Sequence, residues 1–96
     1  MFDKMKQLME MKKQADQIKK ELEAMKIEFN DIRGIKISIN GSQVIQQFEI
    51  DESLMNPANK RRFVDDLKRS INGAIRNSQN LVAQKMKDVM PGFPGL

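Results

Sequence analysis

Basic side chains recur at a regular spacing in the second half of this 96-residue sequence. Arg62, Arg69 and Arg76 are seven residues apart, which places them on one side of a helix. Arg61 and Lys68 directly precede two of these arginines. Because guanidinium and ammonium groups bind phosphate oxygens, the pattern predicts contact with the backbone of duplex DNA. We call this set the basic ridge: Arg61, Arg62, Lys68, Arg69 and Arg76.

Positive charge is concentrated around the ridge. Residues 56–96 hold eight basic and three acidic residues, a net charge of +5, whereas residues 30–55 hold two and four, a net charge of −2. The whole chain carries +4, which favours polyanionic partners. Asp65 and Asp66 offer an alternative, since ion pairs with the ridge at helical spacing would make it an ordinary solvated face. The sequence leaves both interpretations open.

Much of enzyme chemistry is excluded by composition. The sequence has no cysteine and no histidine, and therefore no disulfide, thiolate nucleophile, imidazole base or zinc site built on those ligands. Asp51 and Glu52 are adjacent acids, but acids after a predicted strand more often cap a turn or face water. We expect no enzymatic activity, no cofactor and no small-molecule substrate.

The mode of DNA binding also follows from what is absent. Tyrosine and tryptophan are missing, and most of the five phenylalanines fall on apolar stripes, which argues against a stacking platform for single strands. No recognised motif for reading the major groove is present. The sequence therefore predicts binding to duplex DNA with low base specificity.

The first third of the chain has the pattern of one amphipathic helix. Apolar residues alternate steps of three and four, as in a coiled-coil seam. Lysines occupy two neighbouring stripes beside this seam, and acids occupy the other flank. Lys13 and Lys20, on one lysine stripe, are further candidates for DNA contact. The seam consists of Leu8, Met11, Ala15, Ile18, Leu22 and Met25.

Three short strands are expected next, at residues 26–30, 35–39 and 44–51. Isoleucines alternate with polar residues in the second strand, which indicates one buried face. Gly34 allows a turn before it, and Asn40–Gly41 is the pair that best tolerates positive φ in a hairpin turn after it. In the third strand the alternation predicts two side chains facing one way, Phe48 and Ile50, and two facing water, Gln47 and Glu49.

A second long helix is expected from Asn56 and Pro57, a capping side chain and a first-turn proline, to about Asp88. Gly73 interrupts it and reflects either close packing or simple tolerance. Residues 91–96 contain two prolines and two glycines and predict a flexible tail. The apolar stripe of the helix comprises Phe63, Leu67, Ile71, Ala74, Ile75, Val82 and Met86.

These lengths favour an oligomer. Helices of about 23 and 32 residues are roughly 35 and 48 Å long, more than a compact domain of this size can cover. A three-stranded sheet also has two edges. Pairing one edge with its symmetry mate would satisfy the unpaired backbone groups of that edge and cover the apolar face of the sheet. We therefore expect a homodimer joined at its strands.

The string INGSQVIQQFEIDESL at residues 39–54 resembles the signature of the YbaB/EbfC family of nucleoid-associated proteins. The flanks are similar too: an N-terminal Met-Phe, a methionine-, glutamine- and lysine-rich helix, and a Pro-Gly tail. The resemblance implies an α+β protomer of order α-β-β-β-α with a small antiparallel sheet and two long helices. It also implies a tweezer-like homodimer and duplex DNA binding in the bacterial cytoplasm, at the nucleoid.

In two places the sequence departs from these relatives. Only Asn30 to Gly34 replaces a longer glycine-containing loop, which predicts a tighter first hairpin. Lys68, Arg69 and Ser70 replace a usually apolar helical turn. We expect one domain at residues 1–90. The alternative function is a protein-interaction adaptor that uses the N-terminal helix. Attachment of that helix to acidic membranes is less favoured because of its acidic flank.

Overall fold

The computed structural model describes residues 2–89, in which two long helices flank a three-stranded antiparallel sheet. This arrangement confirms the predicted α+β class and the α-β-β-β-α order. The predicted tail, residues 91–96, lies outside the described residues. The elements are α1 (Phe2–Ala24), β1 (Ile27–Phe29), β2 (Ile35–Ile39), β3 (Ile45–Ile50), the 3₁₀ turns η1 (Glu52–Leu54) and η2 (Pro57–Asn59), and α2 (Lys60–Val89).

The sheet has strand order β1-β2-β3 and is antiparallel throughout. Phe29 of β1 and Phe48 of β3 both pair with Ile37 of β2, so all three side chains belong to one face. The register of β2 and β3 shifts between Ser38 and Ile39, which marks an irregularity near the second hairpin. Both outer strands therefore keep one unpaired edge within the described chain.

The first hairpin turns at Gly34, as predicted. Its φ is +96°, a conformation that favours glycine, and a Cβ there would lie 2.8 Å from Cδ1 of Leu54. The Ile35 amide donates to the Ile32 carbonyl at 3.0 Å and closes the turn. Glycine at this position is required by both backbone angle and space.

The second hairpin does not use Asn40–Gly41 as predicted. Positive φ occurs instead at Gln43, at +67°. Asn40 closes the loop through its side chain, because Oδ1 accepts from the amides of Ser42 at 2.9 Å and Val44 at 3.0 Å. Gly41 is needed for close approach, since an added Cβ would lie 2.9 Å from the Leu22 carbonyl oxygen of α1. Contact with another element, rather than turn type, explains this glycine.

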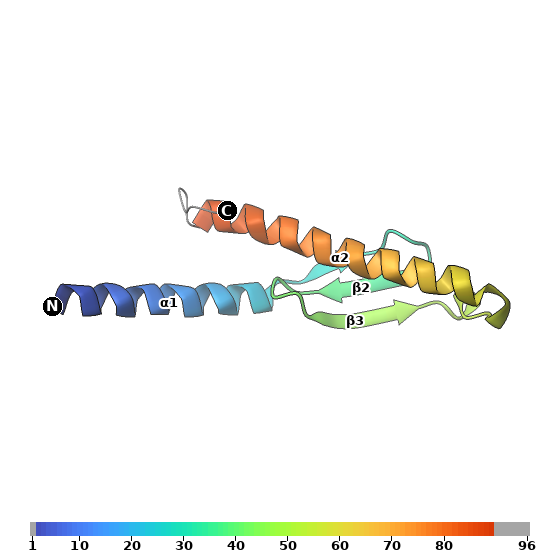
Figure 1. Ribbon diagram of the computed structural model, residues 1–96, viewed down its shortest axis with the longest axis horizontal. Helices are drawn as coiled ribbons and strands as arrows, with labels where there is room; N and C mark the ends of the chain where they lie inside the picture. Colours follow the sequence, from blue (N-terminus) through green and yellow to red (C-terminus); the bar gives the residue numbers. More distant parts are fainter. Residues whose placement is uncertain (1, 90–96) are drawn as a thin grey trace.

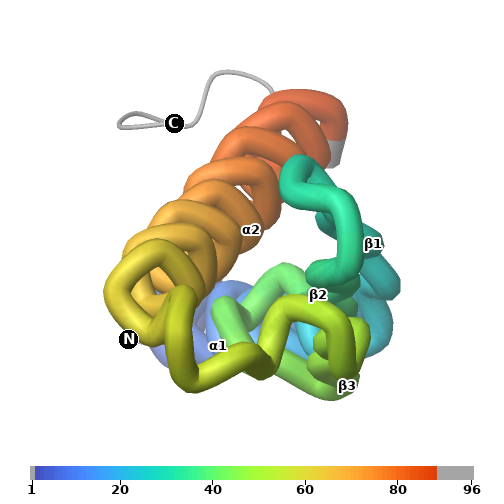
Figure 2. The backbone as a smooth tube through the Cα atoms, turned by 90° about the vertical axis from the view of Figure 1, so that its right-hand side faces the viewer, coloured from blue at the N-terminus to red at the C-terminus, as the bar shows by residue number. Residues whose placement is uncertain are grey.

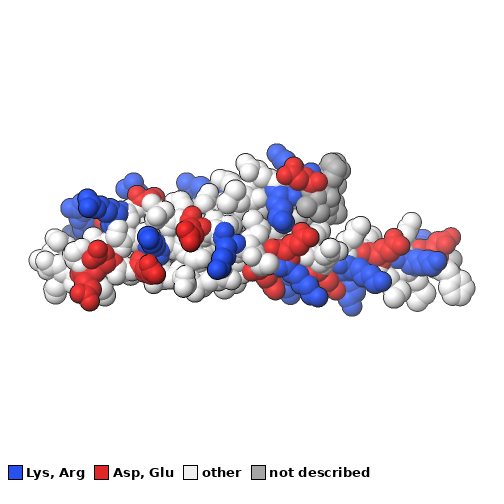
Figure 3. All heavy atoms as spheres, turned by 180° about the vertical axis from the view of Figure 1, so that it is seen from behind, with Lys and Arg blue, Asp and Glu red and all other residues white. Residues whose placement is uncertain are grey.

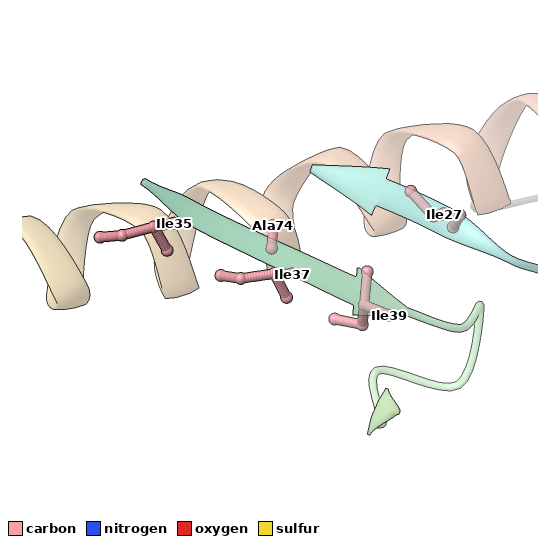
Figure 4. Packing of buried hydrophobic residues seen from close by; sticks show 5 residues of the cluster. All are labelled: Ile27, Ile35, Ile37, Ile39 and Ala74. Atoms are coloured by element: carbon pink, nitrogen blue, oxygen red, sulfur yellow. The ribbon is translucent and has the colours of Figure 1, made fainter. Parts of the chain in front are cut away.

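Helix α2 covers the apolar face of β1 and β2 (Figure 2). Its buried line consists of small residues four apart, Ser70, Ala74 and Ser78. They allow the helix to approach the buried isoleucines of β2, and Figure 4 shows these isoleucines together with Ala74 and Ile27. The buried hydrophobic residues are Ile27, Ile35, Ile37, Ile39 and Ala74.

Gly73 lies where α2 meets β1. An added Cβ would be 2.7 Å from Cζ and 2.8 Å from Cε2 of Phe29. The aromatic ring therefore packs directly on the helix backbone. Of the two interpretations of this glycine, the structure supports close packing.

Phe48 and Ile50 of β3 pair with Ile37 and Ile35 and therefore share one face, as predicted. Gln47 and Glu49 are exposed as expected, but Phe48 also keeps 37% of its surface exposed and Ile50 is half-buried. The reason is that α2 packs mainly on β2 and β1 and leaves the apolar side of β3 uncovered. Burial of alternate residues in a strand requires a neighbour that covers that strand.

The second helix begins slightly later than predicted. Asn56 Oδ1 accepts from the Ala58 amide at 3.0 Å, as expected of a capping residue, but the turn that it caps is the 3₁₀ turn η2. The α-helix proper starts at Lys60 and continues through Val89.

Helix α1 projects beyond the sheet, as its predicted length required (Figure 1). It contains no buried residue. The molecule measures 67 × 21 × 17 Å, far longer than it is wide. One chain therefore leaves most of the apolar seam of α1 in contact with water.

Candidate nucleic-acid interface

The basic ridge lies on the outer side of α2. All five of its side chains are exposed, whereas Ser70, which directly follows Arg69, is buried and donates to Asp31 Oδ1 at 2.8 Å. The buried line of Ser70, Ala74 and Ser78 fixes the rotation of α2 on the sheet, and the arginines at the seven-residue spacing consequently face solvent.

The two acids beside the ridge do not neutralise it through ion pairs. Within residues 2–89, the ion pair at 4 Å or less is that of Lys85 Nζ with Glu21 Oε2, at 3.9 Å. Asp65 is exposed and Asp66 is half-buried. The guanidinium groups of the ridge therefore keep their donors available for an external acceptor.

Lys13 and Lys20 are exposed on α1, far from the start of the ridge. Arg61 and Arg62 lie at the end of the molecule where α2 begins, whereas α1 extends toward the opposite end (Figure 1). Figure 3 shows basic side chains gathered at the first of these ends and basic and acidic side chains alternating along α1. In one protomer the residues predicted to contact DNA are thus distributed along the length of the molecule and do not form one pocket.

The C-terminal end of α1 is hydrogen-bonded to the second hairpin. The Gly41 amide donates to the Leu22 carbonyl at 2.8 Å, and Asn40 Nδ2 donates to the Glu23 carbonyl at 3.4 Å. Ser78 Oγ on α2 donates to the Asn40 carbonyl at 2.8 Å and accepts from Gln43 Nε2 at 3.1 Å. This network couples the orientation of α1 to that of α2, and hence the position of Lys13 and Lys20 to that of the ridge.

Asp51 has a capping role. Its side chain accepts from the Ser53 amide at 3.0 Å at the start of η1. Hydrogen bonds from the amide and the hydroxyl of Ser53 hold the pKa of this carboxyl below its ordinary value of 3.8, and the charge of Arg33 contributes in the same direction. The capping interpretation of these adjacent acids is the one that the structure supports.

Arg33 is a basic residue that sequence reasoning did not select. It lies in a segment of net negative charge, but the fold brings it to a hollow that Arg62 also lines. The only signal in the sequence was its position beside Gly34, at a turn. Its proximity to Arg62 follows from the packing of the first hairpin against the start of α2.

Metal ions and membranes each require a particular arrangement of residues. No group of three or more acidic side chains that could hold a metal ion occurs within the described part of the chain. Neither helix, over the residues that the structure describes, combines the length and apolar character that a transmembrane span requires.

Comparison with known protein families agrees with these features. Residues 1–93 match the YbaB/EbfC DNA-binding family, which extends over nearly the whole chain. The members of this family are DNA-binding proteins and not enzymes, which confirms the expectation drawn from composition. A chain with this fold, this exposed ridge and this match belongs to the YbaB/EbfC DNA-binding family.

Proposed function

We propose that this chain forms a homodimer that binds duplex DNA mainly through backbone phosphates and with low sequence specificity, at the nucleoid in the cytoplasm. The observation that carries this proposal is the basic ridge, exposed along α2 and free of ion pairs within residues 2–89, in a chain of a DNA-binding family. Contacts to phosphate position a protein on DNA but carry no sequence information. We therefore expect the basic ridge to bind duplexes of different sequence with similar affinity.

The dimer half of the proposal rests on an apolar surface beside α2. Gly73 and Ile75 flank the buried Ala74 on opposite sides of the helix, and Gly73 faces Phe29 of β1. Ile75 therefore faces away from β1 and toward β3. We call this surface the open strip: Ile45, Phe48, Val64, Ile71 and Ile75.

The open strip is suited to a second copy of the chain. Ile45, Phe48 and Val64 are 38%, 37% and 44% exposed, and the outer edge of β3 is unpaired within the described chain. Apolar side chains next to an unpaired strand edge favour pairing with an identical edge. If the two copies paired about a two-fold axis at this edge, both α1 helices would project from the joined sheets. Lys13 and Lys20 of each copy would then lie along a projecting helix.

The DNA half is tested by removing charge from the middle of the ridge. We expect the double variant Arg69→Gln, Arg76→Gln to bind a labelled random duplex about a hundredfold more weakly or worse, since charge-assisted contacts contribute about 1.5–3 kcal/mol each. The slope of log affinity against log salt should fall by about 0.9 for each phosphate that the variant no longer neutralises. Fluorescence anisotropy between about 50 and 200 mM salt measures both quantities.

The matched control is Lys26→Gln, Lys36→Gln, which removes the same charge at two exposed positions outside the ridge. It should retain most of the affinity and the salt slope of the parent protein. Equal losses of duplex affinity in the two double variants would show that affinity depends only on the net charge of the protein and not on the basic ridge. Wild-type affinity that does not change with salt would reject phosphate binding altogether.

The exposed apolar side chains of α1 favour a second candidate function, a protein-interaction adaptor. Phe2 is 85% exposed, and Met5 and Met9 are 65% exposed. Methionine side chains adapt to irregular partner surfaces. An adaptor would capture its partner equally well after nuclease treatment and in the Arg69→Gln, Arg76→Gln variant, whereas a DNA-dependent assembly would be lost in both conditions.

A further inference from the structure

A hollow of about 330 Å³ lies at the end of the molecule where α2 begins. Three segments that are separate in sequence form it. The first hairpin contributes Ile32 and Arg33, η1 contributes Ser53 and Leu54, and the start of α2 contributes Arg62. Its apolar residues, Ile32, Leu54 and Phe63, are half-buried, and so is Asp66. The other polar residues of the lining are exposed: Arg33, Ser53, Asn59 and Arg62.

The charges around the hollow favour an anion. Arg33 and Arg62 supply two guanidinium groups, and Asp66 supplies one carboxylate, so the lining has a net charge of +1. Asp51 is outside this lining, but it lies close enough to Arg33 for the guanidinium charge to lower the pKa of its carboxyl. Neither arginine forms an ion pair at 4 Å or less within residues 2–89. The Asn59 amide also lines the hollow and can donate hydrogen bonds, whereas the Ser53 hydroxyl already donates to Asp51.

Two guanidinium groups with a neighbouring amide donor suit an anion that has several oxygens, and phosphate is the usual ligand of such a set. Arg62 belongs both to this hollow and to the basic ridge. Arg33 therefore continues the ridge past the start of α2 and onto the first hairpin. Figure 3 shows basic side chains gathered at this end of the molecule.

We propose that this hollow binds one phosphate group of the DNA backbone, with Arg33 and Arg62 as its two ligands. The inference rests on the proposed DNA-binding function and deepens it by adding a contact residue from the turn of the first hairpin. A free phosphate ion offers the same chemistry, and the experiment separates the two sources.

The first arm compares Arg33→Gln with Lys26→Gln, an exposed lysine outside the hollow whose removal changes net charge equally. We expect Arg33→Gln to weaken binding of a labelled random duplex about tenfold and to lower the salt slope by about 0.9, while Lys26→Gln stays close to wild type. Arg33→Lys should fall between them, because it keeps the charge without the two-pronged geometry. Thermal melting verifies that each variant is folded.

The second arm titrates inorganic phosphate into wild-type protein at constant ionic strength, with the Nε–Hε signals of Arg33 and Arg62 followed by NMR. Saturable shifts with phosphate alone, together with unchanged duplex affinity in Arg33→Gln, would assign the hollow to a free ion and overturn the proposal. No effect in either arm would overturn it as well. If wild-type protein binds no duplex, the proposed function fails by itself, and the proposal that a backbone phosphate occupies the hollow fails with it.

Discussion

Gly73 is an instance of a single residue whose role depends on a neighbour far away in sequence. A Cβ at this position would lie 2.7 Å from the ring of Phe29. Alanine would strengthen the helix by about 1 kcal/mol, but overpacking costs about 1–3 kcal/mol. We therefore expect Gly73→Ala to lower the free energy of unfolding by about 1 kcal/mol, measured by urea denaturation.

The same substitution should change sign when the ring is removed. In a Phe29→Ala background the added methyl group has room, so Gly73→Ala should raise the free energy of unfolding by about 0.5–1 kcal/mol. The two backgrounds form a double-mutant cycle that isolates the contact. Stabilisation in both would mean that the helix merely tolerates glycine and that the close approach to Phe29 is unimportant.

At the scale of elements, the orientation of α1 depends on Asn40. This buried side chain accepts from the amides of Ser42 and Val44 and donates to the Glu23 carbonyl at the end of α1. Asn40→Ala leaves these groups without their partner, which should cost about 1–3 kcal/mol. We also expect faster hydrogen exchange in the last turn of α1, because its anchor to the hairpin is weakened.

Ser42→Ala is the control for this substitution, since Ser42 lies in the same turn and is exposed. It should leave both stability and exchange close to wild type. Equal effects of the two substitutions would show that the turn responds to any change and that Asn40 has no special part in positioning α1.

At the scale of the whole molecule, an extended protomer with an exposed apolar strip should pair with itself. We expect light scattering to give twice the 11.1 kDa of one chain for the wild type. Phe48→Glu or Ile45→Glu should reduce the mass to that of one chain, because a charge in the open strip would be buried without a partner. Circular dichroism verifies that the variants are folded.

Met55→Glu is the matched control, because Met55 is also exposed but lies between η1 and η2, outside the open strip. It should remain dimeric. A wild-type mass of one chain at micromolar concentration would contradict the dimer, whatever the variants do.

Several features were determined by the sequence itself because they depend on local spacing. The alternating isoleucines predicted β2, the length of α1 predicted that it projects beyond the sheet, and the seven-residue repeat placed the arginines on one side of α2. The turn at Gly34 could also be predicted from the sequence, since positive φ is a property of the residue and its immediate neighbours.

Only the tertiary structure decided which apolar residues are covered. Phe48 has the alternation of a buried residue, yet it stays exposed because α2 packs over β1 and β2. Gly41 and Gly73 are explained by the approach of Leu22 and Phe29, and Arg33 meets Arg62 only through the packing of the first hairpin. Local spacing determines the face on which a side chain lies, whereas the position of a distant element determines what that face meets.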